Sequence, residues 1–173
     1  RYESVSACEW STARTGEERA VALAVLARQD APQREWARQL FEKRADLALF
    51  GRALLAQALA LSGTEADLTA ARGVLDEVLQ SAKLDAGTVY FAEVDSDAYA
   101  ATFSTNVRTT AMVLQAMMRV RPDHPLADKV ARYLTSARQG GRYATTQEAA
   151  FALLALQDYA QIRENEAPAF DAT

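Results

Sequence analysis

The chain has 173 residues, of which half are hydrophobic and only four are proline, a composition typical of one folded domain and not of a disordered segment. Lysine and arginine number 19 against 23 aspartate and glutamate residues, and the two signs are interleaved, so the net charge of −4 excludes a basic nucleic-acid-binding surface. A single cysteine excludes a disulfide framework, and the longest apolar runs are shorter than the roughly 18 residues that span a membrane.

The chain divides into a folded domain and two polar ends. Residues 1–15 are interpreted as a lead-in, residues 16–163 as the domain and residues 164–173 as a tail. Because the chain begins at Arg1 and not at methionine, we expect it to be a segment of a longer protein. Hydrophobic periodicity and capping signals predict helices through most of the domain. The predicted helices run over residues 16–29, 32–43, 45–61, 65–82, 104–121, 125–139 and 145–163.

Several of these helices carry local signals at their ends. Thr145 is followed three residues later by Glu148, which is the Ser/Thr-x-x-Glu capping box that opens a helix. Thr64 is expected to cap the helix of residues 65–82, and Pro122 to end the helix before it.

The helices are of two kinds that alternate along the chain. One kind is rich in alanine and leucine on most of its circumference and so requires cover on most sides, whereas the other has one charged side. The first kind is centred near Ala20, Leu54, Met112 and Leu153, and the second near Leu40, Leu75 and Leu134. A repeat of about 35 to 40 residues with two helices per unit predicts stacked helical hairpins. We therefore predict an all-α fold, an α/α toroid with inner and outer helix layers that this chain forms incompletely.

Residues 84–103 interrupt the helical pattern. This stretch combines β-branched and aromatic residues with acids and a glycine, and it is interpreted as an irregular insertion with hairpin character. Its aromatic residues are expected either to form a contact surface for a neighbouring domain or partner, or to plug the end of the toroid. These residues are Tyr90, Phe91, Tyr99 and Phe103.

Few residues suggest catalytic or metal chemistry. Cys8 and His124 are the only residues of their types, and His124 lies between two prolines at a helix start, so the pattern does not predict a nucleophile with its base. The acid pairs Glu17–Glu18 and Asp95–Asp97 suit the first turn of a helix and a solvated loop, respectively. We therefore expect no catalytic residue, no metal site and no cofactor.

Three segments together resemble one protein family. Residues 47–61, 106–117 and 140–159 are similar, in order and spacing, to segments of the thioester-containing domain of alpha-2-macroglobulins, notably the bacterial branch. In that family the last segment has a glycine and an aromatic residue, a Ser or Thr pair with glutamine and an acid, and then an Ala/Leu helix that ends near a tyrosine. The residues that carry these motifs here are Asn106, Gly141, Tyr143, Thr145, Thr146, Gln147, Glu148 and Tyr159.

The resemblance implies an α/α toroid within a large, broad-spectrum protease inhibitor. In that family the attacking protease cleaves a bait region, and this exposes a strained thioester that captures the protease covalently. The resemblance also implies contacts with neighbouring domains of the parent chain and, through the parent, with target proteases. It implies a segment that is not an enzyme and does not insert into a membrane, in a periplasmic or secreted protein of the cell envelope.

One feature of the family is missing from this segment. The family's thioester joins the cysteine and glutamine of a C-x-E-Q sequence, whereas Cys8 is followed by Glu9, Trp10 and Ser11. His124 does not match the histidine that assists acyl transfer in complement relatives, because it stands in a late interhelical turn. The resemblance therefore implies a scaffold role for these residues, with the reactive segment upstream of Arg1 or lost.

Two other classes of protein share parts of this helical pattern. An α/α-toroid enzyme, such as a terpene cyclase or a glycan-processing protein, would need an acid cluster or an aromatic-lined cavity, and the sequence has no D-x-D-D run or repeated Q-W signature. A helical-repeat interaction module of the tetratricopeptide type would need a regular period of about 34 residues and an open groove. Neither the helix spacing nor the apolar circumference of the helices favours that module.

Overall fold

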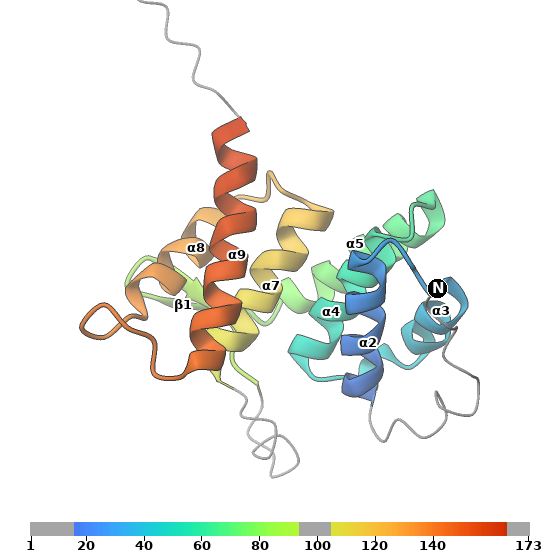
Figure 1. Ribbon diagram of the computed structural model, residues 1–173, viewed down its shortest axis with the longest axis horizontal. Coiled ribbons are helices and arrows are strands. Elements are labelled where there is room, and N and C mark those ends of the chain that lie inside the picture. Colours follow the sequence, from blue (N-terminus) through green and yellow to red (C-terminus); the bar gives the residue numbers. More distant parts are fainter. Residues whose placement is uncertain (1–15, 94–104, 166–173) are drawn as a thin grey trace, which may run out of the picture. The chain divides into compact units, whose positions relative to one another are not determined.

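The computed structural model describes residues 16–93 and 105–165 (Figure 1). These residues fall into two compact units, one up to Gln80 and one from Ser81. They contain seven α-helices, one turn of 3₁₀ helix and a two-stranded hairpin, so the predicted all-α fold is confirmed. Of the residues singled out above, Cys8, Asp95, Asp97, Tyr99 and Phe103 lie outside the described residues.

The first unit is built from two helical hairpins. Its elements are α2 (Gly16–Arg28), α3 (Arg34–Glu42), the 3₁₀ turn η1 (Arg44–Asp46), α4 (Leu49–Ala60) and α5 (Glu65–Leu79). The two Ala/Leu-rich helices α2 and α4 pack against each other, and the amphipathic helices α3 and α5 pack against α4. The unit therefore has one layer of Ala/Leu-rich helices and one layer of amphipathic helices.

The predicted helix of residues 45–61 is wrong at its start, because the chain forms η1 and then extends before α4. Ala48 has an extended backbone, with φ −61° and ψ 164°. Its N–H donates to Glu17 Oε1 at 3.1 Å, whereas in a continuous helix it would bond to the preceding turn. The adjacent Leu47 is buried beside Gly16, where a Cβ atom would lie only 2.5 Å from Leu47 Cδ2. Contacts with α2 therefore override the local helix propensity of this stretch.

The start of α5 is fixed by a buried carboxylate. Thr64 caps the helix as predicted, since its Oγ1 accepts the N–H of Asp67 at 3.1 Å. The Asp67 carboxylate is 2% exposed and accepts hydrogen bonds from Thr64 Oγ1 (2.6 Å), Ser62 Oγ (2.7 Å) and Arg38 Nε (2.9 Å). Burial, the largest single influence, acts to raise the pKa of Asp67, but these hydrogen bonds and the Arg38 charge together lower it. The carboxylate thus joins α3 to the first turn of α5.

The second unit pairs its two Ala/Leu-rich helices in the same way. Its elements are β1 (Lys83–Asp85), β2 (Thr88–Tyr90), α7 (Asn106–Val120), α8 (Ala127–Ser136) and α9 (Thr146–Asn165). Helices α7 and α9 lie side by side (Figure 1), and α8 packs against both of them and against β2. The hairpin therefore contacts the helices mainly through α8, and β2 also contacts α7.

The irregular insertion contains the predicted hairpin. Strands β1 and β2 are antiparallel, with Asp85 opposite Thr88. The two residues of the turn, Ala86 and Gly87, have φ of 44° and 81°, and a type I′ turn requires positive φ at both positions. Glycine adopts this conformation readily, but alanine is strained in it.

Ala86→Asn is expected to raise the free energy of unfolding by about 0.5 to 1 kcal/mol, because asparagine tolerates the left-handed region and Asn-Gly is the preferred type I′ pair. Urea unfolding followed by circular dichroism measures the change. Ala86→Val serves as the opposite control, since a β-branched residue is strained there and should destabilise the chain. Equal stability of the three proteins would contradict the assigned turn.

The four Ala/Leu-rich helices are not buried to the same extent. Helices α4 and α7 are buried on almost every side, as predicted. Helix α2 instead exposes Val21 and Val25, which are 42% and 54% accessible, and α9 exposes Leu153 and Leu154, which are 59% and 48% accessible. The prediction of cover on most sides is therefore wrong for α2 and α9 in the described residues. Within its unit, each of them packs against only one helix of its own kind.

Candidate functional site

The segment that leads into α9 is shaped by two glycines and a tyrosine. Gly140 and Gly141 have φ of 57° and 81°, values that favour glycine, and they turn the chain back after α8. The hydroxyl of Tyr143 then donates to the carbonyl of Leu134, in the last turn of α8, at 2.9 Å. Burial raises the pKa of the Tyr143 hydroxyl. The glycine and aromatic positions of the motif therefore tie this segment to α8.

Tyr143→Phe is expected to lower the free energy of unfolding by about 1 kcal/mol, because it leaves the Leu134 carbonyl without this donor. Thermal or urea unfolding of the two proteins measures the loss. Tyr90→Phe is the matched control, since the Tyr90 hydroxyl has no hydrogen-bond partner within residues 16–93 and 105–165. A loss as large in Tyr90→Phe as in Tyr143→Phe would contradict the role given to the hydrogen bond.

The predicted capping box opens α9. Thr145 Oγ1 accepts the N–H of Glu148 at 3.1 Å, and Glu148 Oε2 accepts the N–H of Ala144 at 3.1 Å. Glu148 thus reaches back to the residue before Thr145, one position further than in the usual box. Its side chain is buried, with the residue only 6% exposed. The motif residues Thr145 and Glu148 therefore fix where the helix begins.

The aromatic residues of the insertion have different environments. Tyr90 stacks on Tyr133 of α8, with ring centroids 5.2 Å apart and 18° between the ring planes. Phe91 has no exposed surface, and its backbone N–H donates to Thr110 Oγ1 at 2.9 Å. The structure therefore places Phe91 in the core and not on a contact surface for a partner. Tyr90 stays partly exposed beside α8.

An open cleft of about 550 Å³ lies between the hairpin turn, the start of α7, the end of α8 and the segment that leads into α9. The charged residues that line it, among those described, are the carboxylates Asp85 and Glu148. Tyr133 also lines the cleft, with the polar side chains of Ser136 and Gln139. Sequence reasoning found Glu148 as a helix cap but missed Asp85 and Tyr133, because the four segments meet only in the fold.

The remaining motif residues do not line this cleft. Three are exposed residues at helix starts, Asn106 of α7 and Thr146 and Gln147 of α9. Tyr159 lies in the C-terminal half of α9, where its hydroxyl donates to Asp128 Oδ1 at 2.8 Å. The same oxygen accepts a hydrogen bond from Arg163 Nη2 at 3.1 Å, so Tyr159 helps to join α9 to α8. Burial, and then the hydrogen bond to Asp128, raise the pKa of Tyr159.

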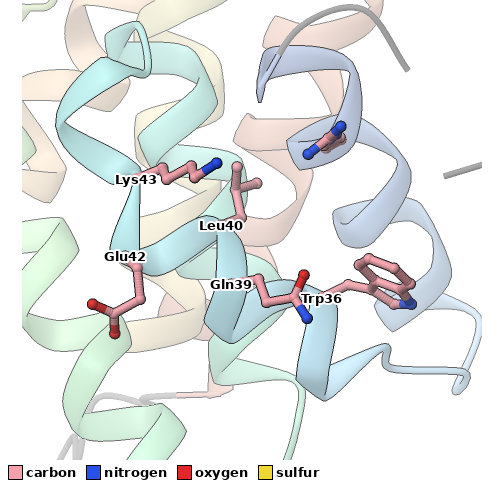
Figure 2. A pocket seen from close by; sticks show the side chains of 6 residues that line it. Trp36, Gln39, Leu40, Glu42 and Lys43 are labelled. Carbon is pink, nitrogen blue, oxygen red and sulfur yellow. The ribbon is translucent and has the colours of Figure 1, made fainter. Parts of the chain in front are cut away.

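A smaller pocket of about 240 Å³ lies on the first unit, between α2 and α3 (Figure 2). Trp36 and Leu40 form its apolar side, and Arg19 and Lys43 supply positive charge. The Glu42 side chain points away from Trp36 in this view. Trp36 is only half-buried, and it lines this pocket.

The described residues do not combine into a catalytic or metal site of another kind. His124 lies in the turn before α8, where its Nδ1 accepts the N–H of Leu126 at 3.2 Å. The helix itself begins at Ala127, two residues later than predicted, and has no side-chain cap. Within the described residues, His, Cys, Asp and Glu side chains do not gather in threes where a metal ion would sit. The helices of this part of the chain are also too short or too polar to cross a membrane.

Comparison with known proteins identifies one family. The family model described as A-macroglobulin TED domain matches residues 18–159, which is most of the chain. No curated protein and no solved structure matches the chain.

Proposed function

Because the chain belongs to the A-macroglobulin TED domain family, we propose that it is part of the thioester-containing domain of a bacterial alpha-2-macroglobulin-like protein. Membership of this family implies protease trapping and not catalysis, by a domain that lies within a larger macroglobulin chain that is extracellular or secreted. For this chain we propose a broad-spectrum inhibitor of the periplasm or cell envelope, which captures proteases after they cleave its bait region.

The observation that carries this proposal is the length of the family match. Residues 18–159 run from α2 into α9, so they include both pairs of Ala/Leu-rich helices and the amphipathic helices beside them. They also include the capped segment at Thr145 and Glu148. A match over this whole series supports a domain of the family more strongly than any one Ala/Leu helix does.

Within that protein, we propose that this segment supplies scaffold and domain contacts while the covalent chemistry comes from elsewhere in the parent chain. A C-x-E-Q thioester needs a glutamine three residues after its cysteine, and that position after Cys8 is Ser11. Cys8 also precedes the matched residues.

The exposed faces of α2 and α9 fit this scaffold role. Val21 and Val25 on α2, and Leu153 on α9, present apolar surface on helices of the kind that a toroid keeps inside. In stacked helical arrays the terminal repeats normally carry a polar outer face. These two apolar faces therefore support an array that continues with further hairpins of the parent domain.

Methylamine treatment of the full-length parent tests this proposal. The amine opens a thioester, so we expect one new free thiol and one methylamine adduct, both mapped by peptide mass to residues outside this chain. The treated parent should also lose the ability to slow a protease toward a large protein substrate, while cleavage of a small peptide substrate is unaffected throughout.

Cys8→Ser in the parent is the matched control. It removes the one cysteine of this segment, and we expect the same thiol release and the same adduct as in the unchanged parent. An adduct within residues 1–173, or release that depends on Cys8, would contradict the scaffold role. A parent that releases no thiol and does not slow the protease would contradict the inhibitor function itself.

A further inference from the structure

The cleft of the second unit has the lining of a site for a cation. Its charged lining residues within the described chain are the carboxylates Asp85 and Glu148, and Ser136 and Gln139 add neutral polar groups. Tyr133 adds an aromatic ring. A volume of about 550 Å³ accommodates the end of a long side chain with room for water.

Glu148 is a buried carboxylate with unused capacity to accept hydrogen bonds. Its Oε2 accepts the N–H of Ala144, whereas Oε1 has no hydrogen-bond partner in the part of the chain that the structure describes. The residue is only 6% exposed, so water reaches this oxygen through the cleft that the side chain lines. Oε1 can therefore accept a hydrogen bond from a donor that enters the cleft, in place of water.

The pKa of the Tyr133 hydroxyl responds to the same two carboxylates. Burial raises its pKa most, and the neighbouring Tyr90, Glu148 and Asp85 raise it further, so both carboxylates act at this ring. The Tyr133 hydroxyl has no hydrogen-bond partner within residues 16–93 and 105–165. Helix α8 ends beside the cleft and α7 begins there, so the partial charges of these two helix ends oppose each other. The negative charge of the cleft therefore comes from the two carboxylates.

We propose that this cleft binds an arginine side chain presented by a partner protein. The guanidinium is planar and permanently charged, and it donates two parallel hydrogen bonds to a carboxylate, such as that of Glu148 or Asp85. It also stacks on aromatic rings, such as that of Tyr133. The two arginines of the adjacent loop, Arg138 and Arg142, do not line the cleft. Arg138 instead donates from Nε to the carbonyl of Thr135 at 3.3 Å.

An NMR titration of the isotopically labelled chain with N-acetyl-arginine amide tests the proposal. We expect saturable shifts of amides around the cleft, such as those of Ala86, Ser136 and Ala144, with a dissociation constant on the order of 1 mM for a single side chain. The binding should weaken as salt is added. N-acetyl-citrulline amide, which has the same shape without the charge, is expected to leave these amides unshifted.

Two variants remove one charge each while keeping the fold. Glu148→Gln keeps an acceptor for the Ala144 N–H, because glutamine also serves in a capping box, and it should weaken binding about tenfold. Asp85→Asn, at an exposed strand end, should weaken it about twofold. Asp123→Asn makes the same charge change in the turn before α8 and should leave the binding unchanged.

Three results would overturn the proposal. One is that the citrulline compound shifts the same amides with the same affinity. The second is that neither Glu148→Gln nor Asp85→Asn weakens binding while both keep the unfolding temperature of the unchanged chain. The third is that the shifts fall outside the cleft. None of these results depends on the thioester or on protease trapping, so they leave the proposed function to its own test.

Discussion

Replacing Ala152 with arginine is expected to lower the free energy of unfolding by about 4 kcal/mol or more, a large share of the stability of a typical domain. Ala152 has no exposed surface and lies on α9, which packs along α7. An arginine there has no room in a close-packed interface and would bring a charge into it. Thermal unfolding followed by circular dichroism measures the effect, and the expected result is loss of the cooperative transition or a much lower midpoint.

Leu153→Arg is the matched control for this prediction. The residue is the next in sequence and is also apolar, but it is 59% exposed. We expect a change within about 0.5 kcal/mol, as for other surface substitutions. If Ala152→Arg kept the midpoint of the unchanged chain, or if Leu153→Arg lowered it as much, the orientation of α9 described above would be wrong.

Asp67→Ala is expected to cost about 2 to 4 kcal/mol in free energy of unfolding. The substitution removes the acceptor for Arg38, Ser62 and Thr64 together and leaves the buried Ser62 hydroxyl without this partner. Urea unfolding at neutral pH measures the cost. Glu65→Ala is the matched control, because Glu65 is an exposed acid in the same helical turn and its ion pair with Arg72 is long, at 3.6 Å. It should cost less than about 0.5 kcal/mol.

The contribution of Asp67 is also expected to depend on pH. Because the pKa of the carboxyl is lower in the folded chain than in the unfolded chain, the unfolded chain binds the proton more readily as the pH falls. The stabilisation is therefore complete above the unfolded pKa, which is about 4, and is lost as the pH falls through the folded pKa. Asp67→Asn cannot titrate, so the difference in stability between it and the unchanged chain should shrink in acid. A difference that stays constant down to about pH 2 would contradict this account.

Local signals in the sequence predicted most of the helices and the residues that open them. Thr64 and Thr145 cap helices in the structure because capping depends on residues within one turn, which a sequence displays directly. The hairpin in the insertion was predictable for the same reason, since a two-residue turn joins its strands. The break before α4 was not, because it depends on Glu17, which is distant in sequence.

The orientation of α2 and α9 shows a second limit of sequence reasoning. An amphipathic helix reveals its buried side, but a helix that is apolar all round does not. In α9 the small residues Ala152 and Ala155 face inward and two leucines face outward, the reverse of what residue size alone suggests. Alanine allows close contact of α9 with α7, and this contact exists only once both helices have formed.

The candidate site was predictable only in part. Glu148 and Tyr143 were identified from the family motif, and both have defined hydrogen bonds in the structure. The cleft beside them also needs Asp85 from the hairpin and Tyr133 from α8, and no spacing in the sequence brings these residues together. For Phe91 the sequence left open a contact surface or a plug of the toroid's end, because burial of this residue depends on packing within the second unit.

The continuous burial of α7 has a consequence for the chemistry of the chain under oxidising conditions. All three methionines of the sequence, Met112, Met117 and Met118, lie on this helix and are at most 4% exposed. Conversion of a thioether to its sulfoxide requires access to the sulfur, so dilute peroxide should leave these methionines unoxidised in the folded chain. Once α7 opens, the sulfurs become accessible, and a sulfoxide is too polar to return to the same apolar positions. Methionine oxidation would therefore both record the opening of this helix and prevent its closure.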